Sequence, residues 1–170
     1  MFALQLASLL LIACGALAQS CENLGDSTPY SKINAYYDVP GYAITLDADK
    51  RCLQPYYRIS TCYKLSNPKG NKHLVMQPDG NAVIYGIGQG WGCNLSLGVC
   101  TKPVWNTQTW NKPGAYITVQ DGRFLVYDAS NQIIWGTNAG SPRTTQLCMQ
   151  NDGNLVLYDN GRAIWDSKTY

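Results

Sequence analysis

Three stretches of the chain share one pattern, in which apolar and polar residues alternate on either side of an Asp-Gly pair. They read QPDGNAVIY at 77–85, VQDGRFLVY at 119–127 and QNDGNLVLY at 150–158. Asp-Gly between two alternating runs is a strong signal for a tight turn, so each stretch predicts a β-hairpin. Because the unit occurs three times, the chain predicts a threefold internal repeat.

The alternation also predicts which side chains of a hairpin face the core. With a period of two, the strand that leaves the first turn places Asn81, Val83 and Tyr85 on one face. Ala82 and Ile84 then point to the opposite face, which we expect to be the core face.

A tryptophan follows each hairpin, within VWNTQT at 104–109, IWGTN at 134–138 and IWDSKT at 164–169. Each segment predicts a further strand, and three such sheets can bury their apolar faces only against one another. The tryptophans are therefore expected to share one core in an all-β fold with pseudo-threefold symmetry. They are Trp105, Trp135 and Trp165.

Composition supports this fold and narrows the function. The chain has 12 Tyr, 5 Trp, 16 Gly and 8 Pro, and aromatic strands broken by turn residues are typical of β domains. Charged residues make up 14% of the 170 residues, and the net charge is +2. Neither nucleic acid nor an acidic membrane is an expected partner of so weakly charged a chain.

The first twenty residues, MFALQLASLLLIACGALAQS, contain no charged side chain and are apolar from Leu6 to Ala13. The small residues Ala16 and Ala18 suit cleavage before Gln19, so residues 1–18 predict a signal peptide and a secreted, extracellular protein. The alternative is an uncleaved membrane anchor, which is disfavoured because the run is too short to span a bilayer comfortably. No later stretch could span one.

Six cysteines remain once Cys14 leaves with the predicted signal peptide. An even number in a secreted chain implies up to three disulfides, and the sequence cannot choose among the pairings. Short separations in the sequence favour the pairs Cys52–Cys62 and Cys93–Cys100. Cys21–Cys148 is then left as the third candidate pair. A predicted N-glycosylation site, Asn94, lies in the loop between the cysteines of the second pair.

Two of the repeats carry the pattern Gln-x-Asp-x-Asn-x-Val-x-Tyr in full. The matching residues are Gln77, Asp79, Asn81, Val83 and Tyr85 in the first repeat, and Gln150, Asp152, Asn154, Val156 and Tyr158 in the third. This pattern resembles the mannose-binding signature of the bulb-type lectins, first known from monocot plants. The resemblance spans residues 46–170, which leaves residues 19–45 as an N-terminal extension. It implies a three-sided β-prism (β-prism II) that binds D-mannose or mannose-rich glycans without a metal ion, a cofactor or catalysis.

The chemistry of the motif suits a sugar. A carboxylate accepts strong hydrogen bonds from hydroxyl groups, and amide side chains both donate and accept. The tyrosine hydroxyl reaches a further position, and valine supplies an aliphatic contact for the ring carbons. Asp-Gly-Asn alone is ordinary turn chemistry, but glutamine at a strand end has no role in the turn.

The middle repeat departs from the motif. Anchored on Tyr127, it places Val119 at the glutamine position and Arg123 at the asparagine position, while Asp121 survives. We expect this repeat to keep the fold and to lose mannose. A shift by one residue would instead place Gln120 at the glutamine position, which leaves residual binding open. In the first repeat, Gly80 stands where plant members often carry a bridging cysteine, so the disulfide framework is expected to differ.

Other functions fit less well. A glycosidase needs two carboxylates across a cleft, but Glu22 is the only glutamate and the motif aspartates belong to separate repeats. His73, the only histidine, is interpreted as a solvated loop residue, and Asp47-x-Asp49 lacks calcium-loop spacing. The alternative to sugar binding is a prism scaffold that binds proteins and little or no sugar.

The last predicted strand, 163–170, runs to the end of the chain. In related lectins such a strand can pair with a second subunit, so the resemblance implies a homodimer. The other arrangement is a strand that folds back on its own sheet and whose charged tip discourages edge pairing.

Overall fold

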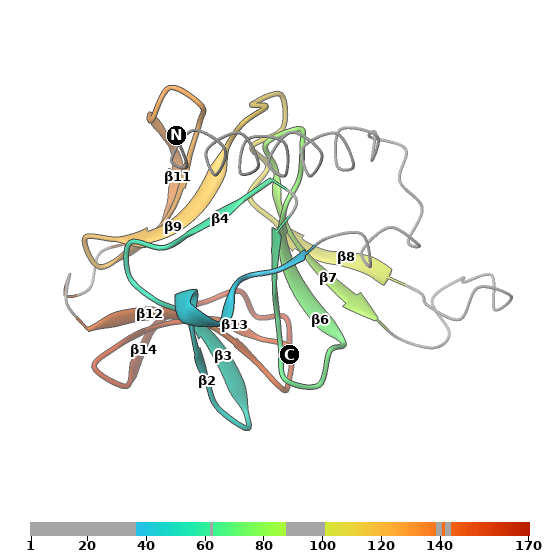
Figure 1. Ribbon diagram of the computed structural model, residues 1–170, viewed down its shortest axis with the longest axis vertical. Coiled ribbons are helices and arrows are strands. Elements are labelled where there is room, and N and C mark those ends of the chain that lie inside the picture. Colours follow the sequence, from blue (N-terminus) through green and yellow to red (C-terminus); the bar gives the residue numbers. More distant parts are fainter. Residues whose placement is uncertain (1–36, 62, 88–100, 139–140, 142–143) are drawn as a thin grey trace, which may run out of the picture.

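Three β-sheets surround one core in the computed structural model, which describes residues 37–61, 63–87, 101–138, 141 and 144–170 (Figure 1). Across the first sheet the order is β1 (Tyr37–Asp38), β5 (Tyr63–Ser66), β6 (Lys72–Met76), β7 (Ala82–Ile87) and β8 (Thr101–Asn106). The second sheet has β11 (Ile133–Gly136), β10 (Arg123–Tyr127), β9 (Tyr116–Gln120) and β4 (Arg58–Ser60). The third has β14 (Arg162–Asp166), β13 (Leu155–Asp159), β12 (Thr145–Gln150), β3 (Lys50–Leu53) and β2 (Ile44–Leu46). The predicted all-β, three-sided prism is confirmed.

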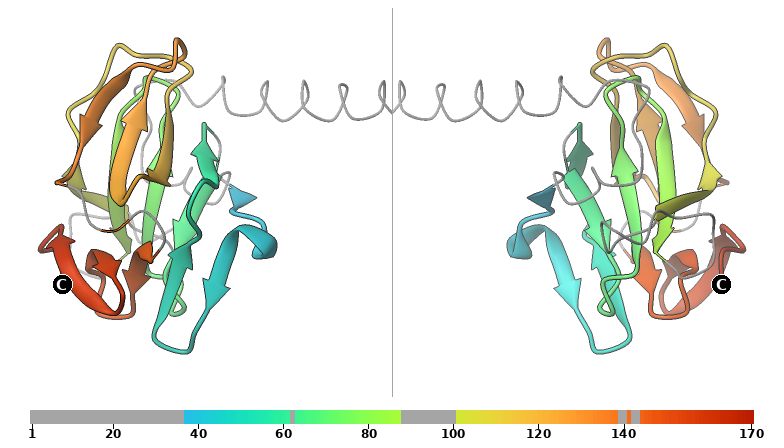
Figure 2. Two further views of the ribbon diagram at one scale, coloured as in Figure 1. Left: turned by 90° about the vertical axis from the view of Figure 1, so that its left-hand side faces the viewer. Right: turned by 90° about the vertical axis from the view of Figure 1, so that its right-hand side faces the viewer.

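One segment early in the chain contributes a strand to each of the three sheets. Residues 50–66 contain β3, β4 and β5, and each of these strands pairs with the first strand of a different hairpin. Figure 2 shows this segment running along the side of the molecule, beside the hairpins that it joins. The short strand β1 is parallel to β5, whereas the hairpin strands pair antiparallel.

The three hairpins share details that the repeated sequence did not reveal. In each, the register between the second strand and the tryptophan strand shifts at the repeat tyrosine, which marks a β-bulge. A matching backbone hydrogen bond then follows each bulge. The bonds run from Thr107 N to Ala82 O, Thr137 N to Phe124 O and Ser167 N to Leu155 O. The pseudo-threefold symmetry therefore extends to individual backbone hydrogen bonds.

The core lies where the three sheets meet, and the predicted tryptophans line it. Their rings contact one another edge to face, with centroids 5.5 to 6.0 Å apart. One symmetry-related core position follows each turn, and there the side chains differ greatly in size: Ala82, Phe124 and Leu155. The fully buried Phe124 ring lies against all three indoles.

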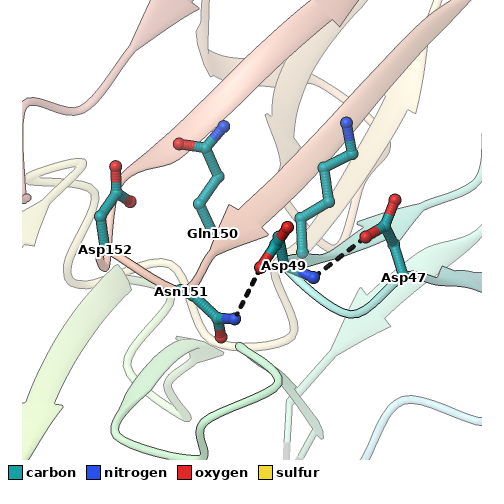
Figure 3. A pocket seen from close by; sticks show the side chains of 6 residues that line it. Asp47, Asp49, Gln150, Asn151 and Asp152 are labelled. Carbon is teal, nitrogen blue, oxygen red and sulfur yellow. Dashed lines mark hydrogen bonds between the residues drawn. The ribbon is translucent and has the colours of Figure 1, made fainter.

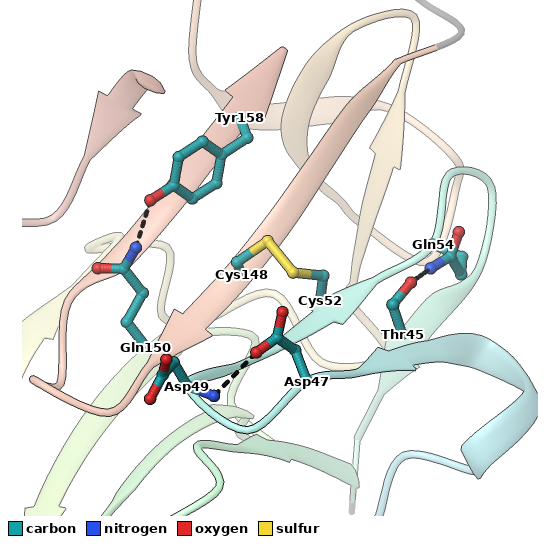
Figure 4. The surroundings of a disulfide bond; sticks show 8 residues. All are labelled: Thr45, Asp47, Asp49, Cys52, Gln54, Cys148, Gln150 and Tyr158. Carbon is teal, nitrogen blue, oxygen red and sulfur yellow. Dashed lines mark hydrogen bonds between the residues drawn. A yellow bond between two sulfur atoms is a disulfide. The ribbon is translucent and has the colours of Figure 1, made fainter. Parts of the chain in front are cut away.

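The disulfide framework differs from the predicted one. Cys52 on β3 and Cys148 on β12 are directly opposite each other in the sheet and form a disulfide (Figure 4). The predicted pairs Cys52–Cys62 and Cys21–Cys148 are therefore wrong, because the pairing of β3 with β12 brings together cysteines that are 96 residues apart in the sequence. The pair Cys93–Cys100 lies outside the described residues.

Several other predictions also fall outside the described residues: the signal peptide 1–18, most of the extension 19–45, and Asn94. The described end of the extension forms β1, a 3-10 turn η2 (Gly41–Ala43) and β2, and these strands lengthen two sides of the prism. Within the described part of the chain, no helix is long and apolar enough to cross a membrane.

The C-terminal strand β14 pairs with β13 of its own sheet. This is the folded-back arrangement considered above, and it leaves β14 at the edge of the third sheet. The homodimer stays a prediction.

Candidate functional site

The complete motif occurs on two sides of the prism, at the turns that join β6 to β7 and β12 to β13. We call these groups site 1 and site 3. Site 1 contains Gln77, Asp79, Asn81, Val83 and Tyr85, and site 3 contains Gln150, Asp152, Asn154, Val156 and Tyr158. In both sites the turn closes through the same backbone bond, from the glutamine N–H to the asparagine carbonyl at 3.0 Å.

A hydrogen bond between glutamine and tyrosine orders the far end of each site. In site 1 the Gln77 Nε2 donates to the Tyr85 hydroxyl at 2.7 Å, and in site 3 Gln150 makes the same bond to Tyr158 (Figure 4). Because the amide nitrogen is engaged, the amide oxygen of each glutamine is oriented as an acceptor. The bond explains why glutamine stands at a strand end where turn chemistry does not require it.

The aspartate of each site is held in an Asx turn. One carboxylate oxygen of Asp79 accepts the backbone N–H of Asn81 at 2.9 Å, and Asp152 does the same for Asn154 at 2.9 Å. The turn fixes where each carboxylate points while the second oxygen lies outside this bond. A fixed carboxylate pays less conformational entropy when a hydroxyl group binds it.

The asparagine of each site has a structural role as well. The side-chain oxygen of Asn154 accepts from the Ser167 hydroxyl at 3.1 Å and the Thr169 N–H at 3.2 Å. The oxygen of Asn81 has the equivalent donors at the end of β8. Only the amide nitrogen is left to meet a ligand, and in site 3 it also donates to Asp166 at 3.0 Å.

The predicted faces of the strand are confirmed. Ala82 and Ile84 are fully buried in the core, whereas Tyr85 on the other face is half-buried. The valines Val83 and Val156 are only 4% and 3% exposed. Each valine therefore offers a small apolar floor rather than a broad contact surface.

A left-handed backbone conformation explains the glycine in the turn between β12 and β13. Gly153 has a φ of +95°, and a Cβ there would come within 2.7 Å of the Lys72 side chain. Lys72 reaches across from the first sheet and donates to the Thr169 carbonyl at 2.9 Å. Burial lowers the pKa of Lys72, and the neighbouring Asp152 carboxylate opposes that shift. Sequence analysis did not single out this cation, because it comes from a different repeat.

The proteins that this chain resembles in sequence and fold include several lectins. No family model matches the chain. The B-type lectin plumieribetin of Scorpaena plumieri is 30% identical over 106 residues, which cover 61% of this chain and 81% of that protein. The chain belongs to the bulb-type lectin family.

Solved structures agree on the fold of this lectin. A monomeric monocot mannose-binding lectin from Gastrodia elata matches with a TM-score of 0.55 and 27% identity, over 71% of this chain and 96% of that one. The mannose-specific agglutinin of snowdrop, Galanthus nivalis, solved with methyl-α-D-mannoside, matches with a TM-score of 0.51 and 28% identity, over 70% and 96% of the two chains. As predicted, the protein is a lectin and not an enzyme.

The middle repeat of the lectin does not follow the alignment anchored on Tyr127. Gln120 pairs directly with Arg123 across a two-residue Asp121-Gly122 turn, whereas the turns of sites 1 and 3 contain three residues between glutamine and asparagine. Gln120 is thus the structural equivalent of the motif glutamine. The placement of Val119 at that position is wrong, because Val119 faces the core and is 1% exposed. The turn of the middle repeat is one residue shorter than the other two, so an alignment anchored on Tyr127 misplaced the glutamine position by one residue.

The middle repeat also lacks the hydrogen bond between glutamine and tyrosine. The Gln120 amide lies near Asp121 instead, at 3.4 Å. Tyr127 stacks on Tyr116 with ring centroids 5.2 Å apart, and the Arg58 guanidinium lies 4.1 Å from the centroid of the Tyr116 ring. This stack replaces the polar arrangement of sites 1 and 3, in line with the expected loss of mannose binding.

The interpretation of His73 as a solvated loop residue is wrong. His73 lies on β6, opposite Tyr85, and is 5% exposed. Its Nδ1 lies 2.8 Å from the Ser66 hydroxyl, which in turn donates to Asp38 at 2.5 Å. Burial, with the nearby Lys64 as the next cause, lowers the pKa of His73 to about 4. The imidazole is therefore neutral near pH 7 and acts as a structural group beside site 1.

A polar pocket adjoins site 3, and sequence analysis did not find it (Figure 3). The pocket has a volume of about 330 Å³. Gln150 and Asp152 of the motif line it, together with Asn151 of the same turn and with residues from the turn between β2 and β3 and the start of β3. These are Asp47, Asp49 and Lys50. Among the described residues, no group of three or more His, Cys, Asp or Glu side chains is arranged to hold a metal ion.

Proposed function

We propose that sites 1 and 3 each bind a mannose residue, either free D-mannose or a terminal mannose of a glycan, and that the protein acts outside the cell. One observation carries the proposal. The bonds from glutamine to tyrosine and from aspartate to the backbone of asparagine occur in both sites. In the middle repeat, Gln120 contacts Asp121, and Tyr127 stacks on Tyr116. Arg123, at the asparagine position, donates to the Thr137 carbonyl.

The fixed groups complement a sugar with several hydroxyls. The aspartate carboxylate accepts from one or two hydroxyl groups, and hydrogen bonds to a charged acceptor are the strongest contacts available here. The asparagine Nδ2 donates, the glutamine Oε1 accepts, and the tyrosine hydroxyl can complete the set. The names of the monocot relatives, which bind mannose or were solved with a mannoside, support mannose as the sugar.

The disulfide supports an extracellular location. Disulfides persist in oxidising compartments and are rare in the cytosol, and Cys52 and Cys148 are paired in the third sheet. Together with the predicted signal peptide, this supports secretion. Binding is expected to persist in EDTA, because the donors and acceptors of each site meet a sugar directly, without a bridging ion.

Calorimetric titration with methyl α-D-mannoside tests the proposal. We expect two sites per chain, each with a dissociation constant around millimolar, or about −4 kcal/mol. Asp79→Asn and Asp152→Asn keep the Asx turn but remove the charge, and each should abolish one site, since hydrogen bonds to charged groups contribute about 1.5–3 kcal/mol. Asp121→Asn in the middle repeat is the matched control and should leave both sites intact.

Two results would contradict the proposal. The first is undiminished binding by the variant that carries both Asp79→Asn and Asp152→Asn. The second is a folded wild-type protein that binds no mannoside at all, which would favour the protein-binding scaffold.

A further inference from the structure

An exposed aromatic side chain stands at the same position beside each complete site. After β8 the chain reads Thr-Gln-Thr-Trp at 107–110, and after β14 it reads Ser-Lys-Thr-Tyr at 167–170. We call these the flanking segments of site 1 and site 3. Their last residues, Trp110 and Tyr170, are 52% and 78% exposed, and neither belongs to the core.

Each flanking segment is anchored on the motif turn beside it. The Thr109 N–H donates to the Asn81 side-chain oxygen at 3.3 Å, and the Thr109 hydroxyl donates to the Gly80 carbonyl at 2.7 Å. In site 3, Thr169 makes both bonds to the matching atoms, at 3.2 and 2.8 Å. The residue before each threonine has a left-handed backbone, with φ of 59° and 56°. Each aromatic residue therefore directly follows a residue that is fixed to the turn, at the rim of the site.

The middle repeat supplies the contrast. Thr137 makes the same backbone bond to its hairpin as Thr107 and Ser167, which fixes the register between the three repeats. The residue three positions after Thr137 is Gly140. The aromatic residue thus accompanies the two complete motifs and is replaced by glycine where the motif has changed. Single exposed apolar residues are ordinary on a protein surface, but symmetry-related ones that follow the motif indicate a shared role.

The motif itself offers a sugar little apolar surface. Its aliphatic side chain is the valine, and Val83 and Val156 are only 4% and 3% exposed. A pyranose presents a weakly apolar C–H face besides its hydroxyls, and small-molecule sites combine a few polar groups with apolar and aromatic ones. Tryptophan and tyrosine provide a large, rigid contact surface that loses little conformational entropy on binding. An aromatic ring at the rim therefore supplies what the motif lacks.

We propose that Trp110 and Tyr170 are ligand-binding residues, whose rings lie against the apolar face of the pyranose bound at site 1 and site 3, respectively. The inference rests on the proposed mannose binding. It assigns the hydroxyls of the sugar to the hairpin and its C–H face to the flanking segment.

The first test uses the full-length protein with Asp152→Asn, which leaves site 1 alone. Adding Trp110→Ala should weaken the binding of methyl α-D-mannoside in titrations by about fivefold, the contribution of about 40 Å² of buried ring surface. Trp110→Phe retains a ring and should change the affinity by less than about twofold. Circular dichroism checks the fold of each variant. Tyr42→Ala is the matched control, because Tyr42 is an equally exposed aromatic residue on η2, outside both flanking segments.

Tryptophan fluorescence gives a second measurement, which a loss of folding does not imitate. Trp110 is exposed in the free protein, so a mannoside that covers its ring should shift the emission to shorter wavelengths and reduce quenching by acrylamide. Trp110→Phe should abolish both changes while the mannoside still binds. The Asp79→Asn protein, which has only site 3, should show neither change.

The Asp79→Asn protein also tests Tyr170. Adding Tyr170→Ala should weaken methyl α-D-mannoside binding at site 3 by about fivefold, whereas Tyr170→Phe, which keeps the ring, should retain the affinity.

The outcomes separate this inference from the proposed function. If the Asp152→Asn or Asp79→Asn protein binds no methyl mannoside, mannose binding at the remaining site is wrong. If both proteins bind it but the two alanine substitutions leave the affinities unchanged, or if the fluorescence of Trp110 does not respond to bound mannoside, the aromatic contact is wrong while mannose binding stands.

Discussion

The Phe124 side chain provides the sharpest test of how the three repeats share one core. Its ring is fully buried, with centroids 6.3, 4.9 and 5.7 Å from Trp105, Trp135 and Trp165. The symmetry-related residues Ala82 and Leu155 are smaller, so Phe124 supplies the aromatic ring that meets all three indoles in the core.

Phe124→Ala should remove these contacts and leave a cavity that the indoles cannot fill without moving. Substitutions of this kind cost about 3–5 kcal/mol, and each aromatic pair adds about 0.5–1.5 kcal/mol beyond burial. We therefore expect a loss near the upper end, about 4–5 kcal/mol. Phe124→Leu, which introduces the type of residue present at position 155, should cost less than half as much.

Guanidinium unfolding followed by tryptophan fluorescence measures the effect, because the probes surround the substituted ring. Ile133→Ala is the control: Ile133 lies on β11 of the same repeat but is 50% exposed, so the change should cost little. A loss below about 1 kcal/mol for Phe124→Ala would show that the core collapses around the missing ring, and the argument from shared packing would fail.

Three further predictions follow from contacts in and near the sites. Replacing both Cys52 and Cys148 with alanine should lower the free energy of unfolding by about 2–5 kcal/mol, because the disulfide closes a long loop; an unchanged denaturation midpoint would contradict this. The pKa of His73 is about 4 in the folded protein and about 6.5 in the unfolded chain, so the unfolded chain binds more protons and stability should fall as the pH drops from 6.5 to 4. His73→Gln should flatten that slope in unfolding curves measured across this range, and a slope that persists would assign the pH dependence to other groups. Tyr158→Phe removes the acceptor for the Gln150 amide and should weaken mannoside binding at site 3 by roughly five- to tenfold in titrations, or about 1 kcal/mol; wild-type affinity would show that the bond does not order the site.

Much of the fold could be predicted because it depends on local signals. Asp-Gly turns, alternating strands and trailing tryptophans recur within each repeat, and each signal concerns residues that are close in sequence. The core faces of Ala82 and Ile84 followed from the same alternation. The motif residues of sites 1 and 3 were identified together, because one hairpin supplies all five side chains of a site.

The rest depends on contacts between distant segments. Nothing local indicates that β3 pairs with β12, and without that pairing neither the disulfide between Cys52 and Cys148 nor the pocket lined by Asp49 could be foreseen. Only the alignment shifted by one residue placed Gln120 correctly. The turn of the middle repeat is one residue shorter, which keeps the hairpin but moves the glutamine one residue closer to the tyrosine. His73 was misjudged because the polar residues around it suggested a loop, whereas Ser66 and Asp38 provide a buried network.

The segment 50–66 gives the prism an unusual order of assembly. Its three strands lie early in the chain, yet their partners β6, β9 and β12 are spread over the remaining sequence, as far as Gln150. During synthesis each hairpin can form as soon as it emerges, but the third sheet stays open until β12 has left the ribosome. Such non-local pairing predicts slow folding. It also means that a nascent chain stalled before β12 would expose the edge of β3 and leave Cys52 without its partner.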